Sequence, residues 1–220
     1  MITLQRTGPL HDAQVGLAAR WGLFEGMEVA AVFADDDVRR LQQAGVVDLS
    51  FKRRAGVKGP GARAWLEAQG MATPAQPNRW QHTADGALVG RLGLTEYVVV
   101  DAADDAAMAR LSQAAPAPGV YAVPRFDAEL LLAGQHVHDV FKQTCTFDFE
   151  SLDLSTQPLV MTSMVGVGVT VLAIAGDKKP YYRLWCDGTY GPYLWRTLTE
   201  LATSFGGGAV GVEALGSLAR

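Results

Sequence analysis

The stretch KPYYRLWCDGTYGPYLWRTL, residues 179–198, contains the pattern that decides the fold. It begins near a proline, continues as a run of aromatic and aliphatic residues typical of a strand, and reaches Asp187 before a helical pattern starts. Residues 94–111, LTEYVVVDAADDAAMARL, have the same order, with a strand that ends at Asp101 and a helix with an acidic start. We therefore expect the two halves of the chain to share one arrangement.

Each half is predicted to contain a strand, a turn and a helix, followed by a hairpin and a second helix. Helices that alternate with hairpins, and not with single strands, favour an α+β fold over a doubly wound parallel sheet. Strands are expected at 27–33, 46–59, 87–101 and, as one pair, 159–187, and helices at 35–45, 60–70, 103–115 and 189–208. Residues 120–134 are expected to form a strand, a turn and a helix, and residues 147–158 a loop or an edge strand.

The composition is that of an ordinary globular protein. The chain has 220 residues, of which 49% are hydrophobic and 19% charged, so it can bury a sizeable core. We expect residues 1–45 to form an N-terminal segment of mixed structure and residues 46–220 to form one compact domain.

Charge and hydropathy narrow the classes of partner. The net charge of −4 argues against a general nucleic-acid binder, which normally has a basic face. The longest apolar run, residues 159–175, is interrupted by glycine, serine and threonine, which favours buried strands over a transmembrane helix. The N-terminus lacks the pattern of a secretory signal, and Cys145 and Cys186 are too few for a disulfide framework. These features predict a cytoplasmic protein whose cysteines lie in the core.

The glycine-rich segment GVKGPGARAWLEAQG, residues 56–70, raises the question of a phosphate site, because backbone amides at a strand-to-helix turn can bind a phosphate. A Walker loop needs lysine and then serine or threonine after its last glycine, but Gly61 is followed by Ala62 and Arg63. A dinucleotide loop needs a third glycine, and Pro60 removes one of the amides. We therefore predict a packing turn.

His136 and His138, with Asp139 and Cys145 further on, are the candidates for a metal site. Two histidines at this spacing share one face of a strand, but no second pair of ligands follows at a recognised spacing. We expect no metal site, and place both histidines at surface or capping positions after a helix that ends at Gly134.

Four segments show a family resemblance when they are taken in order. They are VVDLSFKRRAGVKGPGARAWLEA at 46–68, DGALVGRLGLTEYVVVD at 85–101, YYRLWCDGTYGPYLWRTLTELA at 181–202 and GGGAVGVEALGSL at 206–218. Together they resemble the superfamily of the glycine-cleavage T-protein, an aminomethyltransferase. Within it, TPAQPN at 73–78 and KQTCTFDFESLD at 142–153 are similar to the gamma subunit of heterotetrameric sarcosine oxidase. The resemblance implies a single folate-binding-type domain built from two strand–helix–hairpin halves.

The resemblance also implies where the site residues lie. The catalytic aspartate of the superfamily falls on Asp85, in ADGALVG, which becomes the candidate catalytic and folate-orienting residue. The folate-binding glutamate falls on Arg183, in PYYRLW. A carboxylate accepts hydrogen bonds from a pterin, whereas a guanidinium only donates them. The arginine therefore favours a subunit that resembles the T-protein without being its catalyst.

The implied function is that of a non-catalytic, gamma-type subunit of a heteromeric flavin-dependent amine oxidase or demethylase. Its substrate is expected to be an N-methylated amine such as sarcosine. Larger partner subunits are expected to hold FAD, FMN and NAD, and tetrahydrofolate to receive the one-carbon unit. The alternative is a stand-alone tetrahydrofolate-dependent aminomethyltransferase or methyltransferase, in which Asp85 orients the folate. A third alternative is a binding module without chemistry of its own.

Aromatic residues are dense in the stretch that decides the fold, and tyrosine and tryptophan are enriched at interfaces. Because side chains alternate along a strand, Tyr181, Arg183 and Trp185 share one predicted face, and Tyr182 and Leu184 share the other. If the sheet is covered on a single side, the face with the arginine points away from the core. We therefore expect Tyr181, Arg183 and Trp185 to contact a partner subunit in a hetero-oligomer.

Overall fold

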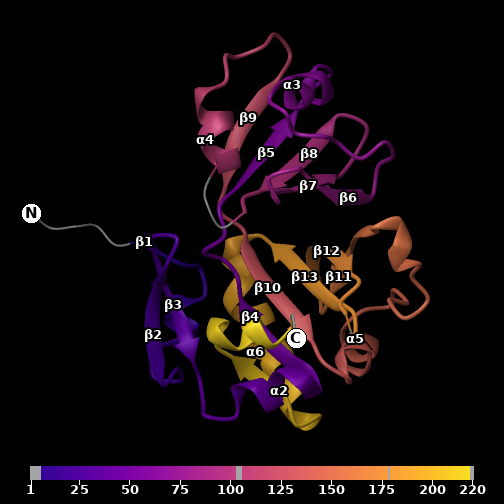
Figure 1. The fold of residues 1–220 in the computed structure, drawn as a ribbon. Coiled ribbons are helices and arrows are strands. Elements are labelled where there is room, and N and C mark those ends of the chain that lie inside the picture. Colours follow the sequence, from indigo (N-terminus) through magenta and orange to yellow (C-terminus); the bar gives the residue numbers. More distant parts are fainter. Residues whose placement is uncertain (1–5, 103–105, 178, 219–220) are drawn as a thin grey trace, which may run out of the picture. The chain divides into compact units, whose positions relative to one another are not determined.

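A computed structural model describes residues 6–102, 106–177 and 179–218. The chain divides into two compact units (Figure 1). The first unit comprises Met1–Phe51, Asp127–Leu154 and Met161–Arg220, and the second comprises Lys52–Phe126 and Ser155–Val160. The predicted N-terminal segment, residues 1–45, is therefore part of the first unit, whereas a single domain over residues 46–220 stays a prediction. None of the described helices is long and apolar enough to cross a membrane.

The second unit is an antiparallel sheet with two helices on one face. Its strand order is β6-β7-β8-β5-β9, with β5 (Arg54–Lys58), β6 (Arg79–His82), β7 (Leu88–Arg91), β8 (Glu96–Val100) and β9 (Tyr121–Arg125). The helices are α3 (Ala62–Ala68) and α4 (Ala106–Gln113). Leu66 of α3 and Leu111 of α4 pack in one apolar cluster with Val57 of β5. Residues 155–160 extend the edge at β6, where the amide of Trp80 donates to the carbonyl of Gln157 over 3.0 Å.

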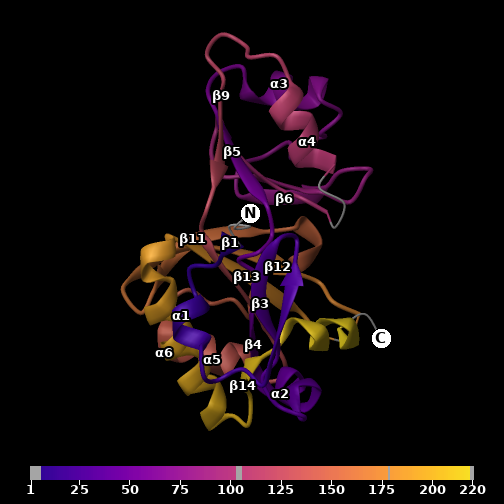
Figure 2. The ribbon, with the colours of Figure 1, turned by 90° about the vertical axis from the view of Figure 1, so that its left-hand side faces the viewer.

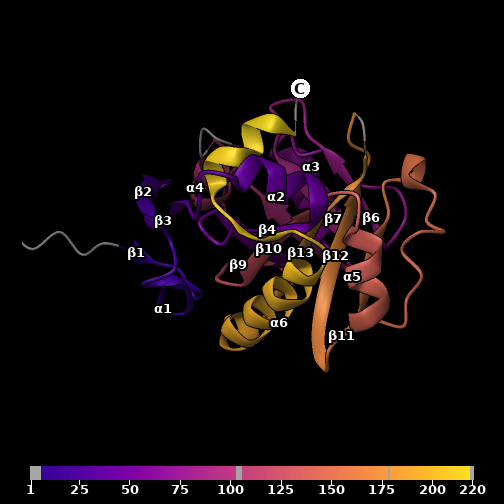
Figure 3. The same cartoon turned by 90° about the horizontal axis from the view of Figure 1, so that it is seen from below.

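The first unit contains a six-stranded sheet that is covered on both faces. Its strand order is β11-β12-β13-β10-β4-β14, with β4 (Gly45–Asp48), β10 (Ala128–Ala133), β11 (Leu159–Met164), β12 (Val167–Ile174), β13 (Tyr181–Cys186) and β14 (Gly208–Val210). Helices α5 (Val137–Thr144) and α6 (Gly191–Ser204) lie on one face, and α2 (Asp37–Ala44) lies on the other (Figure 3). The core on the α2 face includes Leu41, Val47 and Leu131.

A small sheet at the N-terminus completes the first unit (Figure 2). Its strands are β1 (Arg6–Thr7), β2 (Arg20–Phe24) and β3 (Met27–Val32), in the order β1-β3-β2, and α1 (His11–Gln14) lies between β1 and β2 in the chain. Residues of β3 pack in the same cluster as η3 (Val212–Ser217), the last described helix. This cluster covers the face of the large sheet that α5 and α6 leave open.

The predicted internal repeat is confirmed in topology, and so is the α+β class. The second unit runs β5–α3–β6–β7–β8–α4–β9, and the first contains β10–α5–β11–β12–β13–α6–β14. Asp101 caps α4 by accepting hydrogen bonds from the amides of Ala107 and Met108 at 3.0 and 3.1 Å. Asp187 likewise accepts from the amide of Thr189 over 2.9 Å, in η2 (Gly188–Tyr190) before α6. The predicted acidic start at 103–105 lies outside the described residues.

The repeat also explains the glycine-rich segment. Gly59 after β5 and Gly134 after β10 both have left-handed backbones, with φ of 127° and 120°. A side chain at Gly59 would place its Cβ 1.9 Å from the carbonyl oxygen of Gly119. Each glycine therefore permits a close approach of two backbones where a strand turns toward a helix.

Three predictions of secondary structure were wrong. Residues 120–134 contain two strands, β9 and β10, and no helix, because β10 is buried at all six positions in the middle of a sheet. Such packing overrides the helix propensity of alanine, glutamate and leucine. The two histidines lie at the start of α5 and not after a helix end. Residues 159–187 form three strands rather than one pair.

Candidate functional site

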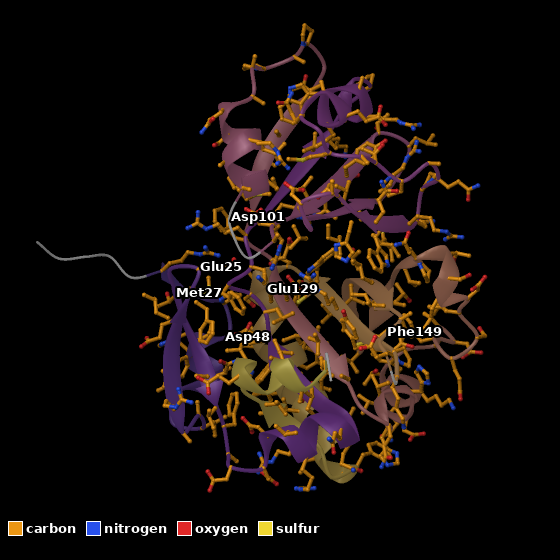
Figure 4. All side chains as sticks on the ribbon, viewed as in Figure 1. Glu25, Met27, Asp48, Asp101, Glu129 and Phe149 are labelled. Atoms are coloured by element: carbon orange, nitrogen blue, oxygen red, sulfur yellow. The ribbon has the colours of Figure 1, made fainter. Side chains whose placement is uncertain are left out.

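The DLS segment, Asp48–Ser50, lies at the end of β4 and is hydrogen-bonded to the start of β10. Asp48 accepts a hydrogen bond from the amide of Ser50 over 2.8 Å, and the Ser50 hydroxyl accepts one from the amide of Glu129 over 3.1 Å. Gln14 of α1 donates from Nε2 to the other Asp48 oxygen over 3.1 Å. Burial raises the pKa of the Asp48 carboxyl, and the charge of Glu129 adds to the rise. The two acids lie on the adjacent strands β4 and β10 (Figure 4).

Glu129 forms a buried ion pair with Arg183 of β13. The Arg183 Nε atom donates to Glu129 Oε1 over 2.5 Å, and the exposed side-chain fractions are 14% for Arg183 and 0% for Glu129. Two buried donors on the same face have no hydrogen-bond partner among the described residues, namely Nη2 of Arg183 and Nε1 of Trp185. Trp185 is the direct neighbour of Glu129 in the β10–β13 register. This face of the sheet therefore has one carboxylate in an ion pair and two donors that are unpaired among the described residues.

The side chains of β13 point alternately to the two faces of the sheet, as predicted, but both faces are covered. Trp185 is 3% exposed, and Tyr182 on the opposite face is 1% exposed. Tyr181 and Arg183 are half-buried. The interface prediction assumed that Trp185 is exposed, and it is not. The cluster that includes residues of β3 and η3 covers this face of the sheet, so the sheet has no open face at Trp185. Contact of this face with a partner stays a prediction.

Asp85 lies in the second unit, in the turn between β6 and β7. Its carboxylate forms an ion pair with Arg110 of α4 at 2.6 Å and accepts a hydrogen bond from the Thr83 hydroxyl. The hydrogen bonds from Arg110 and Thr83 lower its pKa to about 2. The structure therefore joins Asp85 to Arg110, and Arg183 to Glu129, within separate units.

The histidine segment makes contacts with aromatic side chains. His138 Nε2 lies 2.6 Å from the hydroxyl of Tyr182, and burial lowers the pKa of the imidazole and raises that of the phenol to about 12. His136 Nδ1 pairs with Asp139 at 2.9 Å. Within the described part of the chain, no three His, Cys, Asp or Glu side chains are grouped so that they could hold a metal. Cys186 is buried, which raises its thiol pKa to about 11.

Glu129 is the residue that the sequence analysis missed. In the helix that was predicted as the last part of residues 120–134, an acid has an ordinary place on the solvated side. In a strand that is buried at every position, an acid needs a partner, because an unpaired buried charge is costly. The available signal was a single acid inside the apolar run AELLLA, bounded by Asp127 and Gly134.

The repeated topology defines an α+β protein built from two similarly ordered halves, with a buried ion pair between β10 and β13. No protein-family model and no curated protein matches the sequence. Solved structures do share the fold. Aminomethyltransferase T of the glycine cleavage system from Bartonella henselae matches with a TM-score of 0.79 and 18% identity, over 98% of this chain and 62% of that chain.

A chain in the structure of heterotetrameric sarcosine oxidase from Corynebacterium sp. U-96, in complex with pyrrole 2-carboxylate, also matches. The TM-score is 0.69 and the identity is 17%, over 92% of this chain and 97% of that chain. At such identities the likeness establishes the fold, and the T-protein fold implied by the resemblance is confirmed. The aminomethyltransferase is the longer protein, since this chain spans 62% of its length.

Proposed function

We propose that this chain is a non-catalytic, gamma-type subunit of a cytoplasmic, heteromeric, flavin-dependent amine oxidase or demethylase. Its substrate is an N-methylated amine such as sarcosine, and its product carbon enters tetrahydrofolate metabolism. Larger partner subunits hold the flavin and NAD and carry out the oxidation. The observation that supports this role is that both candidate site residues are held in internal ion pairs, Arg183 with Glu129 and Asp85 with Arg110.

These ion pairs remove the chemistry that a catalyst needs. A general base works best with a pKa near the working pH, and the pKa of Asp85 is about 2. A guanidinium cannot take a proton from a substrate at all. Neither group is therefore suited to proton transfer at neutral pH.

The residues around Glu129 fit a folate only in part. The unpaired Nη2 of Arg183 and Nε1 of Trp185 can donate to the carbonyl oxygen of a pterin. The amino group of a pterin needs an acceptor, and the Glu129 carboxylate already accepts from Arg183. We therefore assign the main folate contacts to the rest of the complex.

Exposed apolar side chains on the edge strand β9 support a hetero-oligomer. Tyr121, Val123 and the following Phe126 are 70%, 56% and 75% exposed. Tyr121 and Val123 lie on the same face of the strand, and neighbouring exposed apolar side chains are suited to contact with a partner. In this proposal they contact one of the larger flavin-binding subunits.

Purification of the tagged chain under native conditions tests the proposal. The expected result is a yellow complex with larger subunits, whose flavin spectrum bleaches when sarcosine is added without oxygen. A colourless chain without partners would contradict the subunit role.

A stand-alone tetrahydrofolate-dependent aminomethyltransferase remains the second candidate. It is favoured by the match to aminomethyltransferase T over 98% of this chain and by the buried carboxylate of Glu129. In that case the binding of tetrahydrofolate quenches the tryptophan fluorescence of the isolated chain, and Glu129→Gln removes this quenching. Turnover of a methylated amine by the colourless chain would decide for this candidate.

A further inference from the structure

The first unit contains a cavity of about 290 Å³ at the start of β13. Its lining comes from the last turn of α2, the turn after β10, the beginning of β13 and the end of η3. All of these segments belong to the first unit. The volume lies near the lower end of the range of ligand pockets, which is roughly 300–1,000 Å³. The cavity is therefore suited to a small molecule.

The inner surface of the cavity is apolar and firmly held. Leu41 and Ala133 are 1% and 2% exposed, and Leu218 adds a third aliphatic side chain. The turn after β10 is fixed to α2, because the amide of Gln135 donates to the carbonyl of Gln42 over 2.9 Å. A preformed apolar surface of this kind can bind the hydrocarbon part of a ligand without rearrangement.

Among the polar groups of the lining, Tyr181 and Lys179 offer donors, whereas the glutamines and Ser217 can both donate and accept. The Tyr181 hydroxyl has no hydrogen-bond partner among the described residues, and burial raises its pKa, so that it stays protonated at neutral pH. Lys179 is exposed and forms no ion pair with any described residue. Gln42 adds an exposed amide, and the lining includes no aspartate or glutamate. The cavity therefore combines a positive charge and a hydroxyl donor with an apolar interior.

We propose that this cavity binds a small organic monocarboxylate. The carboxylate is held by the Lys179 ammonium and the Tyr181 hydroxyl, and the apolar body of the ligand packs against Leu41, Ala133 and Leu218. Charge-assisted hydrogen bonds to a carboxylate are stronger than neutral ones, which gives the site a preference for the anion over the neutral amide. This site is separate from the function proposed above and does not depend on it.

Titration with phenylacetate and with neutral phenylacetamide, followed by calorimetry and by ligand-observed NMR, tests the proposal. Phenylacetate is expected to bind at least about tenfold more tightly than phenylacetamide. Tyr181→Phe, which keeps the ring and removes the hydroxyl, should weaken phenylacetate binding about five- to tenfold. Gln42→Glu, a change at an exposed position, should also weaken phenylacetate binding, because it places a negative charge at the rim of the cavity.

Two control variants lie outside the cavity. Tyr190→Phe removes an exposed hydroxyl and Lys58→Ala removes a cation of the second unit, and neither should change binding. Circular dichroism verifies that each variant is folded. The proposal is overturned if phenylacetate fails to bind at millimolar concentration, if the amide binds equally well, or if Tyr181→Phe and Gln42→Glu bind like the unaltered chain.

Discussion

The Nε atom of Arg183 lies 2.5 Å from Oε1 of Glu129, and this contact joins two neighbouring strands in the interior of a six-stranded sheet. Arg183→Met leaves a fully buried carboxylate without this cation. We expect the free energy of unfolding to fall by about 3–5 kcal/mol, as measured by urea denaturation at neutral pH.

The matched control is the double variant Glu129→Leu with Arg183→Met. Replacing both members of a buried pair by apolar residues of similar volume is often neutral, so the double variant should recover most of the lost stability. If the single and double variants are equally unstable, the loss comes from packing and not from removal of the cation that pairs with Glu129.

Asp85→Asn should remove a pH-dependent contribution to stability. The folded pKa of about 2 lies below the ordinary value of 3.8, so the contribution is complete above about pH 5 and disappears as the pH falls toward 2. We expect Asp85→Asn to lower the free energy of unfolding by about 1 kcal/mol at neutral pH. The value is small because the carboxylate is partly exposed and its ion pair with Arg110 is screened by solvent. Unfolding of both proteins between pH 2 and pH 7 measures it, and a constant difference over this range would contradict the assignment.

Gly134→Ala should be strongly destabilising. The backbone there has a φ of 120°, and an added Cβ would lie 2.5 Å from the carbonyl oxygen of Gln43. We expect a loss of about 3 kcal/mol or more in thermal or urea unfolding. Gly168→Ala in β12 is the control, because a Cβ there meets nothing within 4 Å, and it should be neutral or slightly stabilising.

Trp185→Ala should destabilise the fold of the isolated chain and not only weaken an assembly. With Trp185 3% exposed, its truncation is expected to cost about 3–5 kcal/mol of stability. Urea unfolding of the isolated chain measures the loss. A stable variant that fails to join a complex would restore the interface role.

The sequence predicted those elements whose local pattern and packing agree. Helix α6 and strand β13 follow from the spacing in residues 179–198, and the caps at Asp101 and Asp187 lie where strand and helix meet. Strand β10 could not be predicted in this way, because AELLLA has good helix formers at every position. Only its place between β4 and β13 makes it a strand.

The candidate site could be predicted only where the local sequence pattern agrees with the packing. Arg183 was found from a family resemblance, but its partner Glu129 lies on the strand that was predicted as a helix. The packing on both faces of β13 could not be predicted either. The alternation of side chains along a strand does not say whether one face of the sheet is covered or both. Burial of Trp185 follows from segments far away in the sequence.

The position of β4 has a consequence for biosynthesis. Val47 pairs with Leu131 in β10 and with Val210 in β14, so β4 leaves the ribosome long before either neighbour exists. At translation rates of about 5–20 residues per second, β4 waits roughly 8–30 s for its last neighbour. The contiguous stretch of the second unit, Lys52–Phe126, emerges in the meantime and can fold first. Until β14 arrives, an apolar strand with an open edge is exposed to other nascent chains, and a chaperone that shields such strands should raise the yield of folded protein.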